Sequence, residues 1–249
     1  MRGGAQAVEI FAARQHFDYT RRDEVMELAD WFRSNDLEAY SMHAPLFPDR
    51  EMGRAGAPAV NVLHGEKARR IAAMDEIKRA LEAAEYLPLK HLVVHLGEQT
   101  DGWSQRTIEY ALTALEHLGA FGKPLGVRLL VENLLNEATM PGRLITILEM
   151  GHLDNVGVCL DLGHAHVNGG VREAISTLGR RIAAVHVHDN HGMRDEHLWP
   201  GEGTIDWAQT GREIAALEPA PAAVLEINYN LYDAHTASAK VGQAFSLLG

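Results

Sequence analysis

One stretch of the chain, residues 185–206, is rich in side chains that bind metal ions. Its sequence, VHVHDNHGMRDEHLWPGEGTID, holds four His, three Asp and two Glu. The first residues continue an apolar segment, so His186 and His188, two apart, would face the same side of a strand. The remainder is polar and interrupted by Gly and Pro, as in a loop. Imidazole and carboxylate groups suit zinc and other divalent transition metals. The alternative interpretation is a solvated surface loop with incidental histidines.

Residues of the same types end other apolar segments of the chain. Each of six successive predicted strands ends at a His or an acid: His43, His95, Glu132, Asp161, His186 with His188, and Glu226. In parallel α/β folds, catalytic groups gather at the carboxyl ends of the strands. The three acids have no obvious basic neighbour, and an unpaired buried charge is costly. We therefore interpret them as metal ligands rather than as buried ion pairs.

The elements that would position these residues alternate regularly between strand and helix. The predicted strands are 8–12, 37–43, 91–95, 127–132, 156–161, 182–188 and 223–227. The predicted helices are 22–35, 65–86, 104–121, 141–150, 172–178, 206–217 and 236–248. The strands are continuous apolar runs, which indicates a parallel sheet buried on both faces. We expect one α/β domain over residues 1–249, a (β/α)8-type TIM barrel, because a closed barrel brings all strand ends to one point.

The predicted strands number seven, whereas a closed barrel of this type has eight. We therefore expect the first βα unit to be lacking, since the chain begins almost directly on the strand at 8–12. Unpaired strand edges tend to pair with another chain. This predicts a gap or an oligomer contact between the strands at 8–12 and 223–227, and we expect a homo-oligomer.

The amino-acid composition limits which partners the protein can bind and in which cellular compartment we expect it. The formal net charge of −11 disfavours non-specific binding to a nucleic-acid backbone. No apolar run approaches the roughly 20 residues of a membrane span, and the polar start is unlike a signal peptide. The single cysteine, Cys159, fits a reducing compartment. We expect a cytoplasmic protein with no membrane contact.

Several short motifs fall on successive strand ends in one order. They are SMHAPLF (41–47), VVHLGE (93–98), LLVENL (129–134), CLDLGHAH (159–166), HVHDN (186–190), DEHLWPGEGTIDW (195–207) and LEI (225–227). With this order and placement, the chain from residue 8 onward resembles the xylose-isomerase-like barrel superfamily. That superfamily includes sugar isomerases and epimerases, inositol-catabolism enzymes, and apurinic endonucleases of the endonuclease IV type.

Resemblance to the epimerase branch implies one divalent metal ion (Mn, Mg, Co or Zn). The matching ligand positions are Glu132, Asp161, His188 and Glu226, with His186 as the alternative to His188. The same resemblance implies that Glu132 and Glu226 form the acid/base pair. It also implies that His164 contacts the substrate.

Resemblance to the endonuclease IV branch implies up to three zinc ions. The matching sets are His43, His95 and Glu132; then Glu132, Asp161, His188 and Glu226; then His164, Asp195 and His197. That branch places aromatic and basic residues in the loops after its early strands, whereas the loop here begins HAPLF, with no Tyr after the His. Nucleic acid is therefore not the expected partner, and one ion is expected rather than three.

The expected function is that of a metal-dependent isomerase or epimerase acting on a sugar, sugar phosphate or polyol-derived ketone through an enediolate. The alternatives are a multi-zinc phosphodiester hydrolase and a non-catalytic metal- or sugar-binding barrel. Only Arg50, Arg54 and Arg194 are candidates for a phosphate contact. Asp195 and His197 discriminate between the enzyme classes. If Asp195 and His197 converge on His164 and bind a metal ion, the hydrolase is favoured. If they line a pocket that holds a single metal ion, the isomerase is favoured.

Overall fold

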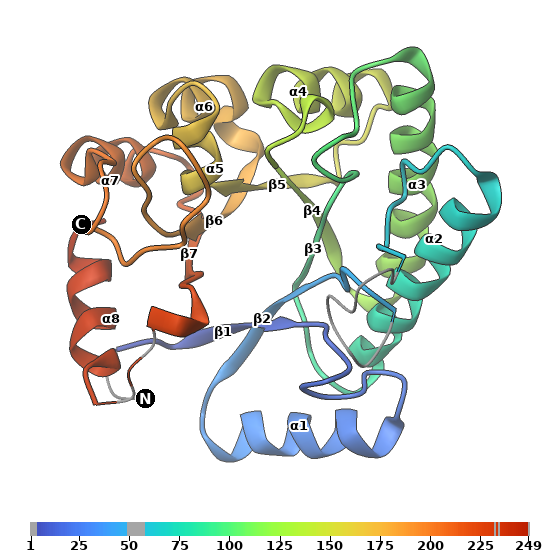
Figure 1. The fold of residues 1–249 in the computed structure, drawn as a ribbon. Helices are drawn as coiled ribbons and strands as arrows, with labels where there is room; N and C mark the ends of the chain where they lie inside the picture. Colours follow the sequence, from blue (N-terminus) through green and yellow to red (C-terminus); the bar gives the residue numbers. More distant parts are fainter. Residues whose placement is uncertain (1–3, 49–57, 232, 234, 249) are drawn as a thin grey trace.

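The apolar segments form one parallel sheet that curves into a nearly closed barrel (Figure 1). The computed structural model describes residues 4–48, 58–231, 233 and 235–248. Their strands are β1 (Ala7–Phe11), β2 (Glu38–His43), β3 (His91–Val94), β4 (Arg128–Glu132), β5 (Gly157–Asp161), β6 (Ile182–Val187) and β7 (Ala222–Leu225). Each strand pairs in parallel with its neighbour in the sequence. The predicted TIM-barrel fold is therefore confirmed.

The helices are α1 (Arg22–Ser34), α2 (Lys67–Glu82), α3 (Gln105–Gly122), α4 (Pro141–Met150), α5 (Leu162–Val167), α6 (Val171–Leu178), α7 (Trp207–Ala215) and α8 (Ala237–Ser246). Figure 1 shows all but the short α5 arranged around the outside of the strands. Each matches a predicted helix within a few residues, except α5. The Asp161 side chain caps α5 by accepting a hydrogen bond from the His164 N–H at 2.6 Å. This cap puts His164 directly above the end of β5.

The barrel has a seam between its first and last strands. Within the described part of the chain, β1 and β7 share no ladder of hydrogen bonds. All four residues of β7 are half-buried, whereas every residue of β5 is buried. The predicted gap at this place is confirmed. That another chain covers the seam remains a prediction.

Side chains of alternate strand residues fill the barrel interior. Val93, Leu130, Cys159 and Ala184 form a small apolar cluster there, separate from the larger core that includes the inward faces of the helices. The metal-ligating candidates lie above this cluster, at the carboxyl ends of the strands. Within the described residues no helix is both long and apolar enough to cross a membrane.

The Cys159 thiol is expected to be unreactive in the folded protein. It is fully buried, and burial raises its pKa to about 12, so the reactive thiolate is scarce near pH 7. An aromatic disulfide reagent should therefore label the single thiol only after guanidinium is added. Rapid labelling in native buffer would contradict the burial of Cys159 in the barrel interior.

Candidate metal centre

Ten side chains at the carboxyl end of the barrel form four overlapping groups of possible metal ligands. In each group the ligand atoms lie within 4.8 Å of one another. The groups are His43, His95 and Glu132; Glu132, Asp161, His186 and Glu226; His164, Asp195 and His197; and His188, His197 and Glu226. The predicted convergence of the strand ends is thus present in the structure.

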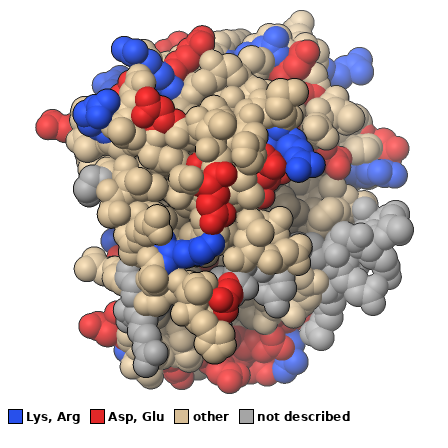
Figure 2. Space-filling model, turned by 60° about the vertical axis from the view of Figure 1, so that its left-hand side comes forward, with Lys and Arg blue, Asp and Glu red and all other residues tan. Residues whose placement is uncertain are grey.

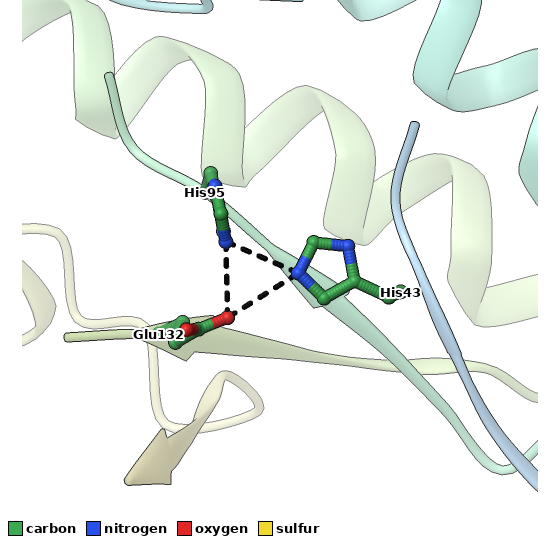
Figure 3. A group of neighbouring side chains, drawn as sticks. All are labelled: His43, His95 and Glu132. Carbon is green, nitrogen blue, oxygen red and sulfur yellow. Dashed lines mark hydrogen bonds and ion pairs between the residues drawn. The ribbon is translucent and has the colours of Figure 1, made fainter. Parts of the chain in front are cut away.

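The first group joins the ends of β2, β3 and β4 (Figure 3). Oε2 of Glu132 lies 3.1 Å from Nε2 of His95 and 3.4 Å from Nε2 of His43. The Nδ1 of His43 lies 2.9 Å from the Ala44 backbone oxygen, so this nitrogen carries a proton. Its Nε2 is then the nitrogen that faces Glu132 and is available to bind a metal ion.

The central group brings three carboxylates around one imidazole. Nδ1 of His186 lies 2.9 Å from Oε2 of Glu226, 3.7 Å from Glu132 and 3.9 Å from Asp161. Although burial opposes ionisation, the charge of His186 lowers the pKa of Glu226 to about 2. Burial also opposes ionisation of Glu132. The charges of His95 and, to a smaller extent, His186 nevertheless hold the pKa of Glu132 well below its usual range. Both glutamates are therefore carboxylates at neutral pH.

At the β6 end, both histidines of the predicted pair belong to groups of possible ligands. His186, not His188, lies with the three carboxylates, because it is still inside the strand and points into the barrel. His188 follows the strand end and is fully buried. Its Nε2 lies 3.0 Å from both oxygens of Asp161. His188 also belongs to a group of possible ligands, with His197 and Glu226, so the choice between the two histidines stays a prediction.

The third group depends on the loop between β6 and α7. Oδ2 of Asp195 lies 3.2 Å from Nε2 of His164 and 2.9 Å from Nε2 of His197. The Nδ1 atoms of both histidines face backbone oxygens at 2.9 Å, those of Asn133 and Glu226. Burial acts to lower the pKa of His197, but its bond to Asp195 raises it to about 9. Asp195 and His197 therefore do converge on His164.

Four buried polar atoms of the site form no hydrogen bond, and these residues fit a metal ion. Nδ1 of His186, Nδ1 of His188, Oδ1 of Asp195 and Oε2 of Glu226 are buried and have no hydrogen bond. An unsatisfied buried polar atom costs about 1–3 kcal/mol. A divalent cation coordinated by imidazole and carboxylate would satisfy such atoms, and this donor set suits zinc and similar metals.

Asp189 holds the loop that carries Asp195 and His197. It is fully buried. Its carboxylate accepts four hydrogen bonds, from N–H groups of Asn190, Ile205, Gly201 and the Trp207 indole, at 2.7 to 3.2 Å. Gly203 allows this close packing, since a Cβ there would lie 2.3 Å from Asp189 Oδ1. Sequence reasoning gave Asp189 no role, although an acid directly after the His-containing strand was a visible signal.

Replacing Asp189 by Asn is expected to loosen the loop, because the amide nitrogen cannot accept hydrogen bonds. The expected loss of unfolding free energy is about 3 kcal/mol, from losing hydrogen bonds to a buried charge. Denaturant unfolding measures it. The control is Glu202→Gln on the same loop, where an exposed pair with Lys240 is removed and the change should stay below about 1 kcal/mol. Equal effects of the two variants would refute the role of Asp189.

A cavity of about 410 Å³ opens beside the ligand groups. His95, His164 and Asp195 line its inner side. Apolar side chains form much of its wall (Leu46, Phe47, Val60, Leu134, Leu135), and Glu98 and Gln99 add polar groups. The volume suits a small organic ligand. None of the described lining residues is Lys or Arg.

Of the three arginines proposed for phosphate binding, the structure describes only Arg194. Arg50 and Arg54 lie outside the described residues. Arg194 is exposed and pairs with Glu196 at 3.3 Å. On the face in Figure 2, the described Lys and Arg side chains are interspersed with Asp and Glu and form no continuous basic patch. Such a surface is unlike a nucleic-acid interface.

A second side chain missed by sequence reasoning is Glu9 on β1. It is nearly buried, and its Oε1 lies 2.9 Å from Nε2 of His186. Burial opposes ionisation, but the charge of His186 lowers the pKa of Glu9. The signal in the sequence was an acid in the middle of the otherwise apolar VEIF segment.

Comparison with known proteins gives one family match over nearly the whole chain. The model of the xylose isomerase-like TIM barrel family matches residues 2–246. Among solved structures, a D-tagatose 3-epimerase-like protein has a TM-score of 0.77 at 24% identity, covering 98% of this chain and 89% of that one. The zinc-bound IOLI protein has a TM-score of 0.74 at 18% identity, covering 98% and 88%. At these identities the likeness shows the fold.

Curated relatives carry names from both enzyme branches. An uncharacterized protein of Methanocaldococcus jannaschii, MJ1311, is 32% identical over 53% of this chain and 49% of its own length. A probable endonuclease 4 of Haloquadratum walsbyi is 29% identical over 69% and 68%. An inosose isomerase of Bacillus velezensis is 22% identical over 82% and 71%. The chain spans about half the length of the first of these relatives.

Proposed function

Because the chain belongs to the xylose isomerase-like TIM barrel family, we propose that it is a metal-dependent isomerase or epimerase of a small sugar or polyol-derived ketone. The observation that carries this proposal is the cavity of about 410 Å³ lined by His95, His164 and Asp195, which belong to the two groups that flank the central one. It has room for a small substrate and, among its described lining residues, no cation that would favour a phosphate. Sugar epimerases and an inosose isomerase are among the similar proteins, which supports the same class.

The central group is the proposed holder of the metal ion, through Glu132, Asp161, His186 and Glu226. A divalent ion there supplies Lewis-acid polarisation of a substrate carbonyl. His188 fixes the orientation of the Asp161 carboxylate through its two 3.0 Å contacts.

The two glutamates of the central group are the proposed acid/base pair. They come from the ends of β4 and β7, which are not neighbours in the sheet, so they reach the same centre from different sides. One carboxylate removes the proton next to the substrate carbonyl, and the other returns it. Proton transfer by a positioned group contributes about 10²–10⁴-fold. His95 and His164 line the cavity and would bind substrate hydroxyls.

Deuterium exchange tests this chemistry before the natural substrate is known. The metal-loaded protein is incubated in D₂O with a panel of ketohexoses, ketopentoses and inosose-type ketones, followed by NMR. Incorporation at the carbon next to the carbonyl is expected for at least one member. No incorporation with any member, together with cleavage of a phosphodiester, would contradict the isomerase.

A metal-dependent phosphodiester hydrolase is the second candidate, and a specific observation favours it. Two further ligand groups flank the central one, and the chain could therefore hold three ions. They are His43, His95 and Glu132, and His164, Asp195 and His197. Metal ions close together can activate water and stabilise a leaving oxygen. The net charge of −11 argues against a nucleic-acid substrate. Cleavage of an abasic-site oligonucleotide by protein holding three metal ions would favour this function.

A further inference from the structure

Glu9 and His186 form a buried contact between the first strand and the proposed metal centre. Glu9 lies on β1 and His186 on β6, and Glu9 Oε1 is 2.9 Å from His186 Nε2. The side chain of His186 is fully buried and that of Glu9 is 8% exposed. The other oxygen of Glu9 accepts a hydrogen bond from the Ser41 hydroxyl at 2.6 Å. Both carboxylate oxygens of Glu9 are thus engaged.

This contact determines which nitrogen of His186 faces the metal centre. A carboxylate can only accept, so Nε2 of His186 carries the proton that it donates to Glu9. Nδ1 faces Glu226 at 2.9 Å and Glu132 at 3.7 Å, and a metal ion bound there would replace the proton on Nδ1. Nδ1 is also one of the buried atoms without a hydrogen-bond partner. A carboxylate that accepts from the far nitrogen fixes the ring orientation and makes the near nitrogen a stronger ligand.

Glu9 itself is not placed to bind the ion. It belongs to none of the four groups of possible ligands, whereas His186 belongs to the central one. We propose that Glu9 is a positioning residue, which orients His186 and strengthens it as a metal ligand. This inference rests on the proposed metal site, because it assigns a role in that site.

The position of Glu9 in the barrel gives the contact a second consequence. Among the described residues, β1 pairs only with β2 and forms one side of the seam. The bond from Glu9 to His186 crosses the barrel interior and connects this edge strand to β6. Metal binding at His186 should therefore hold β1 more firmly and slow hydrogen exchange of its backbone amides.

Glu9→Gln tests the proposal because it keeps the shape of the side chain and removes its charge. Zn²⁺ affinity is measured by competition with a chromophoric chelator. We expect affinity to fall about 10–100-fold. Zn²⁺ should slow amide exchange in β1 of the unchanged protein and have little effect in the variant. The matched control is Glu76→Gln, a buried carboxylate that accepts hydrogen bonds from Arg14, Tyr19 and Arg79, away from the ligand groups.

The control separates positioning from general destabilisation. Thermal unfolding of the zinc-free proteins shows how much each variant loses in stability alone. Unchanged Zn²⁺ affinity in Glu9→Gln, or an equal fall in Glu76→Gln, would overturn the role of Glu9 while leaving the metal site intact. Failure of the unchanged protein to bind Zn²⁺ would instead refute the metal site, and this inference with it.

Discussion

Replacing Glu132 by Gln is expected to lower turnover by about 10³-fold or more, within the usual range for loss of a positioned acid or base. Glu132 belongs to two ligand groups, since it contacts His95 at 3.1 Å and lies with His186 in the central group. The variant therefore loses both a proposed metal ligand and a proposed proton acceptor. Steady-state kinetics on the substrate found by deuterium exchange, with metal analysis, measures both losses.

The control for this prediction is Glu137→Gln. Glu137 follows the same strand but is exposed and pairs with Arg143. Its substitution should leave turnover within about twofold of the unchanged protein, since exposed ion pairs contribute little. Near-normal turnover in Glu132→Gln would remove Glu132 from the mechanism.

Replacing His186 by Ala is expected to weaken metal binding far more than replacing His188 by Ala. The first variant removes the only imidazole of the central group. The second removes a side chain that orients Asp161 through its Nε2. Loss of an orienting contact typically lowers metal affinity about 10–100-fold, and loss of the ligand itself should exceed about 10³-fold. Calorimetric titration with Zn²⁺ compares the two.

The order of these effects decides which histidine is the ligand. Both side chains are fully buried, so both variants lose packing, and their unfolding free energies should fall by similar amounts. A larger loss of affinity in His188→Ala than in His186→Ala would restore the ligand that the sequence predicted.

The sequence predicted the barrel well because its evidence is local. Continuous apolar runs identify the strands, and each acid or histidine at their ends is visible in the chain. The helix α5 was missed because six residues are too few to show a periodicity, and its start depends on the Asp161 cap. The seam was predicted because the sequence contains seven strand segments, one fewer than a closed barrel of this type needs, and counting them requires no knowledge of contacts.

The details of the site depended on contacts between distant residues. The choice between His186 and His188 depends on where β6 ends, and this position is uncertain by a residue or two from a sequence. Glu9 lies 177 positions from its partner, so the acid within the apolar VEIF segment gives no indication of which residue it contacts. Asp195 and His197 reach His164 because buried Asp189 folds the loop back, and no local pattern encodes that set of hydrogen bonds.

Convergence of Asp195 and His197 on His164 leaves metal occupancy as the question that separates the two enzyme classes. The sequence predicted that convergence of these residues with metal bound would favour the hydrolase. The structure shows the convergence, and the number of bound metal ions has still to be measured. The cavity favours the isomerase, while the flanking groups favour the hydrolase. Activity assays depend on finding a substrate, but the positions of bound ions do not.

Anomalous diffraction from crystals grown with Zn²⁺ tests the central claim most directly, because it reports both the number and the location of the ions. We expect one strong anomalous peak, located among Glu132, Asp161, Glu226 and Nδ1 of His186. Three peaks, one at each of the central and flanking groups, would contradict the single-ion isomerase and favour the hydrolase. The absence of a peak beside His186 would contradict the proposed metal site itself.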